Sequence, residues 1–148
     1  MRSFVSSLLL LVPLLVGSAG AWAGVGRILS FDGDVFVNGQ QVTAATVLNK
    51  DDTVATGPDA SVQIILSDNS VLDLESDSEI DINDYSFNPS EPEENTSQIS
   101  VLAGTLRYVS GKIAKDDPEN VSFTAGTSTI GVRGTYISIS VCPDEGCD

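Results

Sequence analysis

The stretch from Thr124 to Val141 reads TAGTSTIGVRGTYISISV and combines two local patterns. In its second half, from Ile137 to Val141, apolar residues alternate with serines, which predicts a strand with one buried face. Three glycines interrupt the first half: Gly126, Gly131 and Gly134. Glycines in a strand pattern indicate corners, where the backbone needs positive φ or approaches a neighbour closely.

A phosphate-binding loop is the other structure that such glycines can form. Gly126 and Gly131 have the spacing of that loop, but Val132 stands where its lysine is needed, and a strand pattern follows instead of a helix. We therefore read the segment as a corner. Arg133 either ties this corner to a carboxylate or to carbonyl oxygens, or it contacts a partner. The candidate interaction motif comprises Gly131, Arg133, Gly134 and Thr135.

The rest of the chain also consists of short alternating segments separated by turn residues. Asn38-Gly39 predicts a two-residue hairpin, and Asp68-Asn69-Ser70 predicts a turn between two strands. Two polar segments, residues 88–97 and 115–120, read as loops with a tendency to disorder. The tripeptides Ala-Gly-Thr at 103–105 and 125–127 favour a β-roll or β-solenoid-like fold, with a β-sandwich as the alternative all-β fold.

The N-terminus has the pattern of a secretory signal peptide over residues 1–23. It has a positive charge at Arg2, an apolar run from Leu8 to Val16, and small residues before a cleavage site between Ala23 and Gly24. The apolar run is shorter than the roughly 20 residues of a spanning helix. We expect an exported protein, periplasmic or secreted, that meets the membrane only through this leader.

The mature chain is strongly acidic, with six basic residues against 21 acidic ones. This balance argues against nucleic acid as a partner. Six residues with oxygen-bearing side chains alternate in one segment: Asp73, Glu75, Asp77, Glu79, Asp81 and Asn83. Either the segment bends and spreads these charges, or calcium binds them, which leaves a calcium-stabilised structural envelope protein as the alternative function. No metal site and no cofactor is assigned.

Catalytic and metal-binding residue sets are poorly represented in this sequence. The chain has no histidine, so a Ser-His or Cys-His nucleophile cannot form. Its two cysteines, Cys142 and Cys147, flank Pro143 and Gly146, which favour a tight reversal. In an oxidising compartment we expect a disulfide between them. The sequence therefore argues against an enzyme.

In order along the chain, four segments resemble the FecR-domain family: GRILSFDGDVFVNGQQV, VLNKDDTVATGPDASVQIILSDNSVLDLESDSEIDI, LAGTLRYVSG and TAGTSTIGVRGTYISISV. The heptapeptide TIGVRGT, Thr129 to Thr135, is the most specific part. Where the family pattern has glycine, this chain has Asp51 and Asn69. Apart from glycine, Asp and Asn are the residues that best tolerate left-handed φ, so we expect both turns to be kept.

The resemblance implies an extracytoplasmic all-β domain over residues 24–141, followed by a tail at 142–148. Full-length members of its signalling branch look like transmembrane regulators that handle a sigma factor and read an outer-membrane transporter. The resemblance supports transferring only the module, a non-enzymatic domain that binds an envelope protein or a surface component in signalling or assembly. The sequence leaves the oligomeric state open.

Cleavage after Ala23 has a spectroscopic consequence, because the only tryptophan, Trp22, lies in the leader. We expect the protein purified from the envelope to show tyrosine emission and no tryptophan emission, whereas protein refolded with its leader shows both. Tryptophan emission from the envelope form would contradict cleavage at this position.

Overall fold

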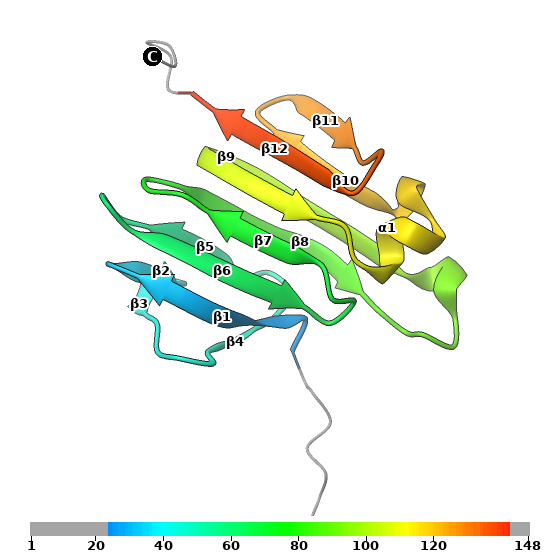
Figure 1. Ribbon diagram of the computed structural model, residues 1–148, viewed down its shortest axis with the longest axis horizontal. Helices are drawn as coiled ribbons and strands as arrows, with labels where there is room; N and C mark the ends of the chain where they lie inside the picture. The colour runs from blue at the N-terminus through cyan, green and yellow to red at the C-terminus, as the bar shows by residue number, and fades with distance from the viewer. Residues whose placement is uncertain (1–23, 143–148) are drawn as a thin grey trace, which may run out of the picture.

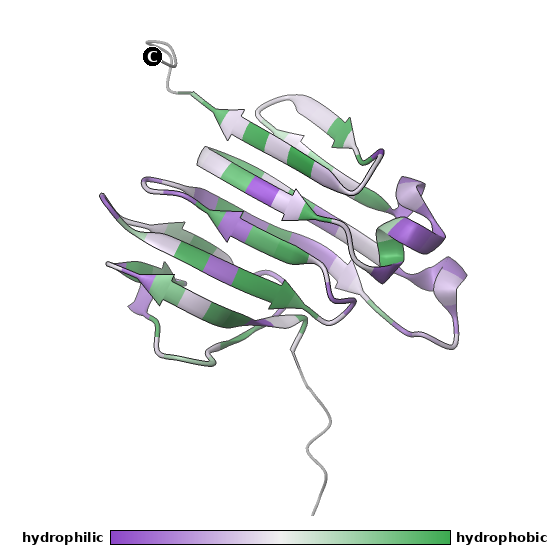
Figure 2. Cartoon of the chain, in the orientation of Figure 1, coloured by the Kyte–Doolittle hydropathy of each residue, from purple (hydrophilic) through white to green (hydrophobic). Residues whose placement is uncertain are grey.

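Two-residue alternation of apolar and polar side chains produces twelve strands and little helix in the computed structural model, which describes residues 24–142 (Figure 1). Apolar and polar bands alternate along the strands (Figure 2). The predicted all-β fold class is confirmed. The strands form one sheet that curls into two layers, and the chain passes repeatedly from one layer to the other.

Both layers contain part of the long strand β9 (Thr96–Val109). The first layer has, in order, β4 (Val47–Leu48), β1 (Gly26–Asp32), β6 (Ser61–Leu66), β7 (Val71–Leu74), β9 and β12 (Tyr136–Val141). The second layer has, in order, β3 (Gln40–Gln41), β2 (Val35–Val37), β5 (Thr53–Thr56), β8 (Glu79–Ser86), β9, β10 (Val121–Ala125) and β11 (Ser128–Gly131). The β9–β10 pair is parallel, and the other pairs are antiparallel.

A bend at Gly104 lets β9 serve both layers. Before the bend β9 pairs with β8 and β10, and after it with β7 and β12. Gly104 has φ +75°, and a Cβ on it would lie 2.6 Å from the Cα of Ser78 and 2.7 Å from the carbonyl oxygen of Asp77. A side chain here would therefore force β9 away from the turn between β7 and β8.

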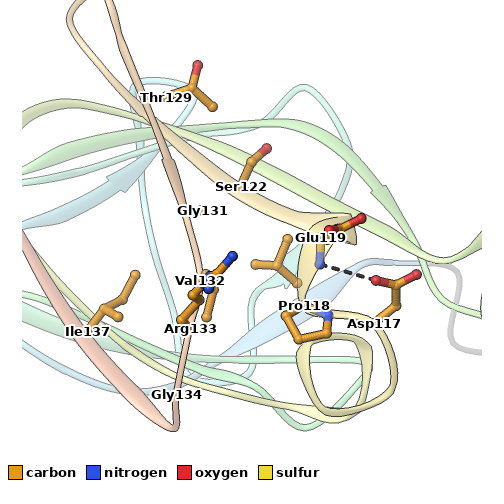
Figure 3. Close-up of a pocket in the computed structure, with 11 residues that line it drawn as sticks. Asp117, Pro118, Glu119, Ser122, Thr129, Gly131, Val132, Arg133, Gly134 and Ile137 are labelled. Atoms are coloured by element: carbon orange, nitrogen blue, oxygen red, sulfur yellow. Dashed lines mark hydrogen bonds between the residues drawn. The ribbon is translucent and has the colours of Figure 1, made fainter.

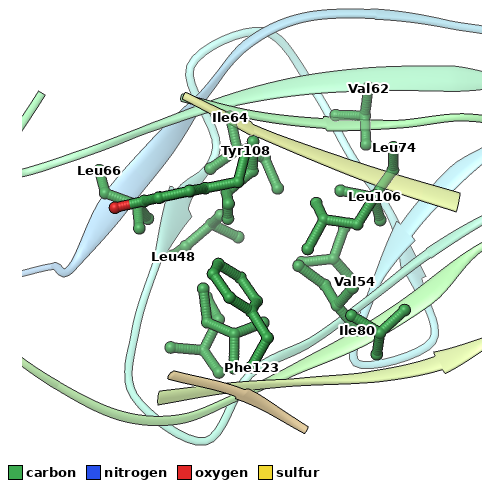
Figure 4. Close-up of a cluster of buried hydrophobic side chains, with 14 of the residues drawn as sticks. Leu48, Val54, Val62, Ile64, Leu66, Leu74, Ile80, Leu106, Tyr108 and Phe123 are labelled. Carbon is green, nitrogen blue, oxygen red and sulfur yellow. The ribbon is translucent and has the colours of Figure 1, made fainter. Parts of the chain in front are cut away.

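The core fills the space between the layers (Figure 4). The strands of both layers supply fully buried side chains, among them Ile64, Leu72, Leu106, Val54, Ile80 and Ile99. The rings of Tyr108 and Phe123 meet edge to face, with centroids 5.0 Å apart and planes at 61°. This contact joins β9 in the first layer to β10 in the second. Its edge-to-face geometry stabilises the fold beyond the burial of apolar surface.

The carboxylate of Asp68 is buried, with 1% of the residue exposed, and accepts four hydrogen bonds. Its Oδ1 accepts from the backbone N–H and Oγ of Ser70 and from the hydroxyl of Tyr85, at 3.1, 2.6 and 3.0 Å. Its Oδ2 accepts from the backbone N–H of Ile113 at 3.2 Å. The carboxylate thus ties the β6–β7 turn to β8 and to helix α1 (Lys112–Asp116).

Burial of the two tyrosines beside this carboxylate disfavours their ionised forms. Desolvation raises the pKa of Tyr108 to about 12 and also raises the pKa of Tyr85, and in both cases the charge of Asp68 adds to the effect. These phenols therefore remain neutral in the folded protein at physiological pH.

The turns predicted from short motifs are confirmed. Asn38 and Gly39 have φ of 51° and 78° between the paired strands β2 and β3, as a two-residue hairpin requires. Asp51 and Asn69, which replace glycines of the family pattern, have φ of 68° and 63°. Asp and Asn therefore keep the left-handed turns without glycine.

The two polar segments are more ordered than the sequence suggests. Residues 88–97 contain a 3-10 turn at Pro92–Glu94, and the side chain of buried Asn95 accepts from the backbone N–H of Asn88 at 2.6 Å. Helix α1 and a second 3-10 turn, Pro118–Asn120, connect β9 to β10. Composition did not reveal the helix because it has five residues and buries only Ile113 and Ala114.

Asp68→Asn should lower the free energy of unfolding by about 2–4 kcal/mol, because an amide nitrogen in place of Oδ2 cannot accept the hydrogen bond from the N–H of Ile113 and leaves that donor buried without a partner. Urea denaturation measures this loss. Asp59→Asn is the matched control, since Asp59 is exposed with φ 56°, and it should change stability by less than about 0.5 kcal/mol. Equal effects of both substitutions would contradict the role given to Asp68.

Gly104→Ala should cost about 3–5 kcal/mol, because the new Cβ meets the backbone at Asp77 and Ser78. Gly39→Ala is the control: Gly39 has nearly the same φ but no atom within 4 Å of the added Cβ. This control should show only the strain of positive φ, about 1 kcal/mol. Thermal melts of the two variants compare the costs, and similar melting temperatures would show that contact at Gly104 does not matter.

Candidate functional site

A groove of about 1000 Å³ lies beside the corner between β11 and β12 (Figure 3). Its walls come from the start of β10, from β11, from the corner and from the connection after α1. Apolar groups come from Val121, Val132, Ile137 and Pro118, and polar groups from Ser122 and Thr129. The groove is therefore an open, largely apolar surface with polar groups at intervals.

The corner motif predicted from the sequence forms one margin of this groove. β11 ends at Gly131, Val132 is buried, and Arg133, Gly134 and Thr135 are exposed before β12 begins. Ser110, the residue after β9, forms two hydrogen bonds with the corner. Its N–H donates to the carbonyl oxygen of Thr135 at 2.9 Å, and its Oγ donates to the carbonyl oxygen of Gly134 at 2.8 Å. Sequence reasoning did not identify Ser110, because a serine after a strand carries no specific signal.

The three glycines of this region have different roles. Gly126 and Gly134 have φ of +59° and +110°, so the corner interpretation is confirmed for both. Gly131 does not have positive φ, and a Cβ on it would meet nothing within 4 Å. Its predicted role as a corner glycine is wrong in conformational terms, since it is simply the last residue of β11.

Arg133 lines the groove with an exposed side chain. Within the part of the chain that the structure describes, it forms no ion pair and no hydrogen bond. The sequence left two roles open for this guanidinium. One of them, a structural tie to a carboxylate or a carbonyl oxygen, is therefore absent among residues 24–142.

The opposite wall of the groove is acidic. Asp117 and Glu119 lie there, and the Asp117 Oδ1 accepts from the backbone N–H of Glu119 at 3.2 Å, which caps the 3-10 turn (Figure 3). One cationic margin and one anionic margin thus flank an apolar floor. These two oppositely charged margins were not predictable from the sequence, because residues 117–119 read only as a polar loop.

The acidic segment from Asp73 to Asn83 does not form a single charged face. It bends between β7 and β8, with Asp77 at φ 52°, so that Asp73 lies in one layer and Asp81 in the other. The Asp73 carboxylate accepts from Gln63 Nε2 at 2.8 Å, Asp81 accepts from Thr53, and Glu75 pairs with Arg107. Of the two arrangements left open, the bend is the one observed, and no group of three or more metal-binding side chains gathers within residues 24–142.

Two predictions fall on residues whose structure is not described. The signal-peptide cleavage site joins Ala23, outside the described residues, to Gly24. The disulfide joins Cys142 to Cys147, which also lies outside them. Both stay predictions. Within residues 24–142, no helix has the length and apolar character needed to cross a membrane.

Comparison with known proteins bears directly on the resemblance noted in the sequence. The family model described as FecR protein matches residues 52–146. This range contains the β6–β7 turn, both halves of β9 and the corner motif of the groove. No curated protein and no solved structure matches the chain. The chain belongs to the FecR protein family.

Proposed function

We propose that this chain is an exported, non-enzymatic module that binds another envelope protein through the groove beside Arg133, in signalling or assembly. The observation that carries the proposal is an exposed guanidinium with no ion pair or hydrogen bond among the described residues, held at the margin of an apolar groove. An Arg side chain in this state has five donors available for a carboxylate or a carbonyl of a partner.

The rigidity of the groove supports this role. Ser110 fixes the carbonyl groups of Gly134 and Thr135, and the buried side chain of Val132 anchors the residue before Arg133. A site held in this way loses little conformational entropy when it binds. Membership of the FecR family, with its association with envelope signalling, points in the same direction.

The groove also indicates the chemistry of its partner. The apolar floor at Val121, Val132 and Ile137 suits an extended segment with apolar side chains. A carboxylate at one end of that segment would meet Arg133, and a cation at its other end would meet Asp117 and Glu119. We propose a protein segment of this kind as the ligand.

Site-specific photocrosslinking in cells tests the proposal. A photoreactive residue at Thr129, in the groove, should capture one defined envelope protein, identified by mass spectrometry. The same group at Ser30, exposed on β1, should not capture it. Arg133→Ala should reduce capture from Thr129 at least tenfold with an unchanged melting temperature, because Arg133 contacts a partner and supports no other described residue.

Arg107→Ala is the matched control for this substitution, since Arg107 is also an exposed arginine but pairs with Glu75 on the outer face of the first layer. It should leave capture unchanged. Equal capture at both probe positions, or no effect of Arg133→Ala, would overturn the proposal for this groove.

A further inference from the structure

The outer edge of β12 is open. Within the described residues β12 pairs only with β9. The carbonyl oxygen of Thr135 accepts from the N–H of Ser110, on the β9 side. Backbone groups of an antiparallel strand point alternately to its two neighbours, so those of Ile137 and Ile139 face β9. The N–H and C=O groups of Tyr136, Ser138 and Ser140 therefore face outward.

This edge is the longest one that the described part of the sheet leaves open. The other edge strands are shorter: β3 and β4 have two residues each and β11 has four, against six in β12. Exposed edges are normally protected by charged side chains, proline or a bulge. The sequence YISISV of β12 has no charge and no proline, and its register with β9 shows no bulge.

Charge distribution favours this edge as the place where a second acidic chain can approach. Residues 24–104 contain 15 acidic and two basic residues, whereas residues 105–148 contain six acidic and four basic ones. Two copies that met through their β1–β8 regions would bring like charges together, which opposes association. Through β12 they would meet with uncharged strands.

The sequence of β12 is also complementary to itself. If two copies pair antiparallel with Ser138 opposite Ser138, Ile137 of each lies opposite Ile139 of the other, and Tyr136 lies opposite Ser140. Apolar side chains then face apolar ones on the core side of the layer, where Ile139 is buried and Ile137 half-buried. Hydroxyl groups lie side by side on the outer face, and Tyr136, which is 57% exposed in the single chain, lies beside Ser140 of the other copy.

We propose that two copies of this chain associate through β12, which continues the first layer from one copy into the other. The contact is isologous, with the two-fold axis at Ser138. It uses backbone groups that the single chain leaves unpaired, in the same way as strand addition to a sheet edge. This contact shares Ile137 with the groove beside Arg133 but does not use the Arg133 guanidinium.

Analytical ultracentrifugation of the mature protein over a range of concentrations tests the proposal, with Ser138→Pro and Ser138→Ala as a matched pair. The Ser138 N–H faces the open edge, so proline removes a donor that the single chain does not use. Ser138→Pro should weaken self-association at least tenfold, whereas Ser138→Ala keeps the donor and should leave it within about twofold. Circular dichroism checks that both variants are folded.

A second variant acts through charge and leaves the backbone donors in place. Ser140→Lys puts a cation at each end of the paired strands and should also weaken self-association at least tenfold. In the wild type, amide exchange at Tyr136, Ser138 and Ser140 should slow as concentration rises, while exchange at exposed Gly39 stays constant.

Three results would overturn the proposal: a wild-type chain that stays monomeric at millimolar concentration, a dimer that Ser140→Lys leaves intact, or a dimer without protection of the β12 amides. Partner capture from Thr129 is measured separately. Loss of self-association with capture retained would leave the proposed function standing, and loss of capture with self-association retained would leave the β12 contact standing.

Discussion

A single buried carboxylate connects three elements of this fold that lie far apart in the sequence. Asp68 accepts hydrogen bonds from its own turn, from Tyr85 on β8 and from the first turn of α1. A carboxylate without these donors would not remain in an apolar environment, because burial of an unpaired charge costs several kcal/mol. The three elements are therefore stable in their positions only together, and the course of the chain from β9 to β10 depends on that arrangement.

The close approach of Gly111 belongs to the same constraint. A Cβ on this residue would lie 2.6 Å from the carbonyl oxygen of Asp68, so only glycine lets the start of α1 reach the turn. The helix then turns the chain back so that β10 runs parallel to β9. The apolar core and the corner beside the groove thus both depend on one polar contact at the end of the sheet.

Alternation and turn chemistry predicted much of this fold from the sequence. Strands such as β6, β7 and β12 and the left-handed turns at Asp51 and Asn69 were predictable, because each depends on a few adjacent residues. The pairing of β9 with four partners was not, since it depends on where distant segments meet. For the same reason the sequence identified Arg133 and its neighbours but not Asp117, Glu119 or Ser110, which the fold brings to the same place.

The four-sided pairing of β9 has a consequence for the order of events during synthesis. Its two halves need β7 and β8, which precede it, and β10 and β12, which follow it. Contacts between segments this far apart in sequence slow folding, because loops must close before the contacts can form. The layers cannot be completed until residues near 141 have left the ribosome, so the two-layer fold is reached only when nearly the whole chain has been translated.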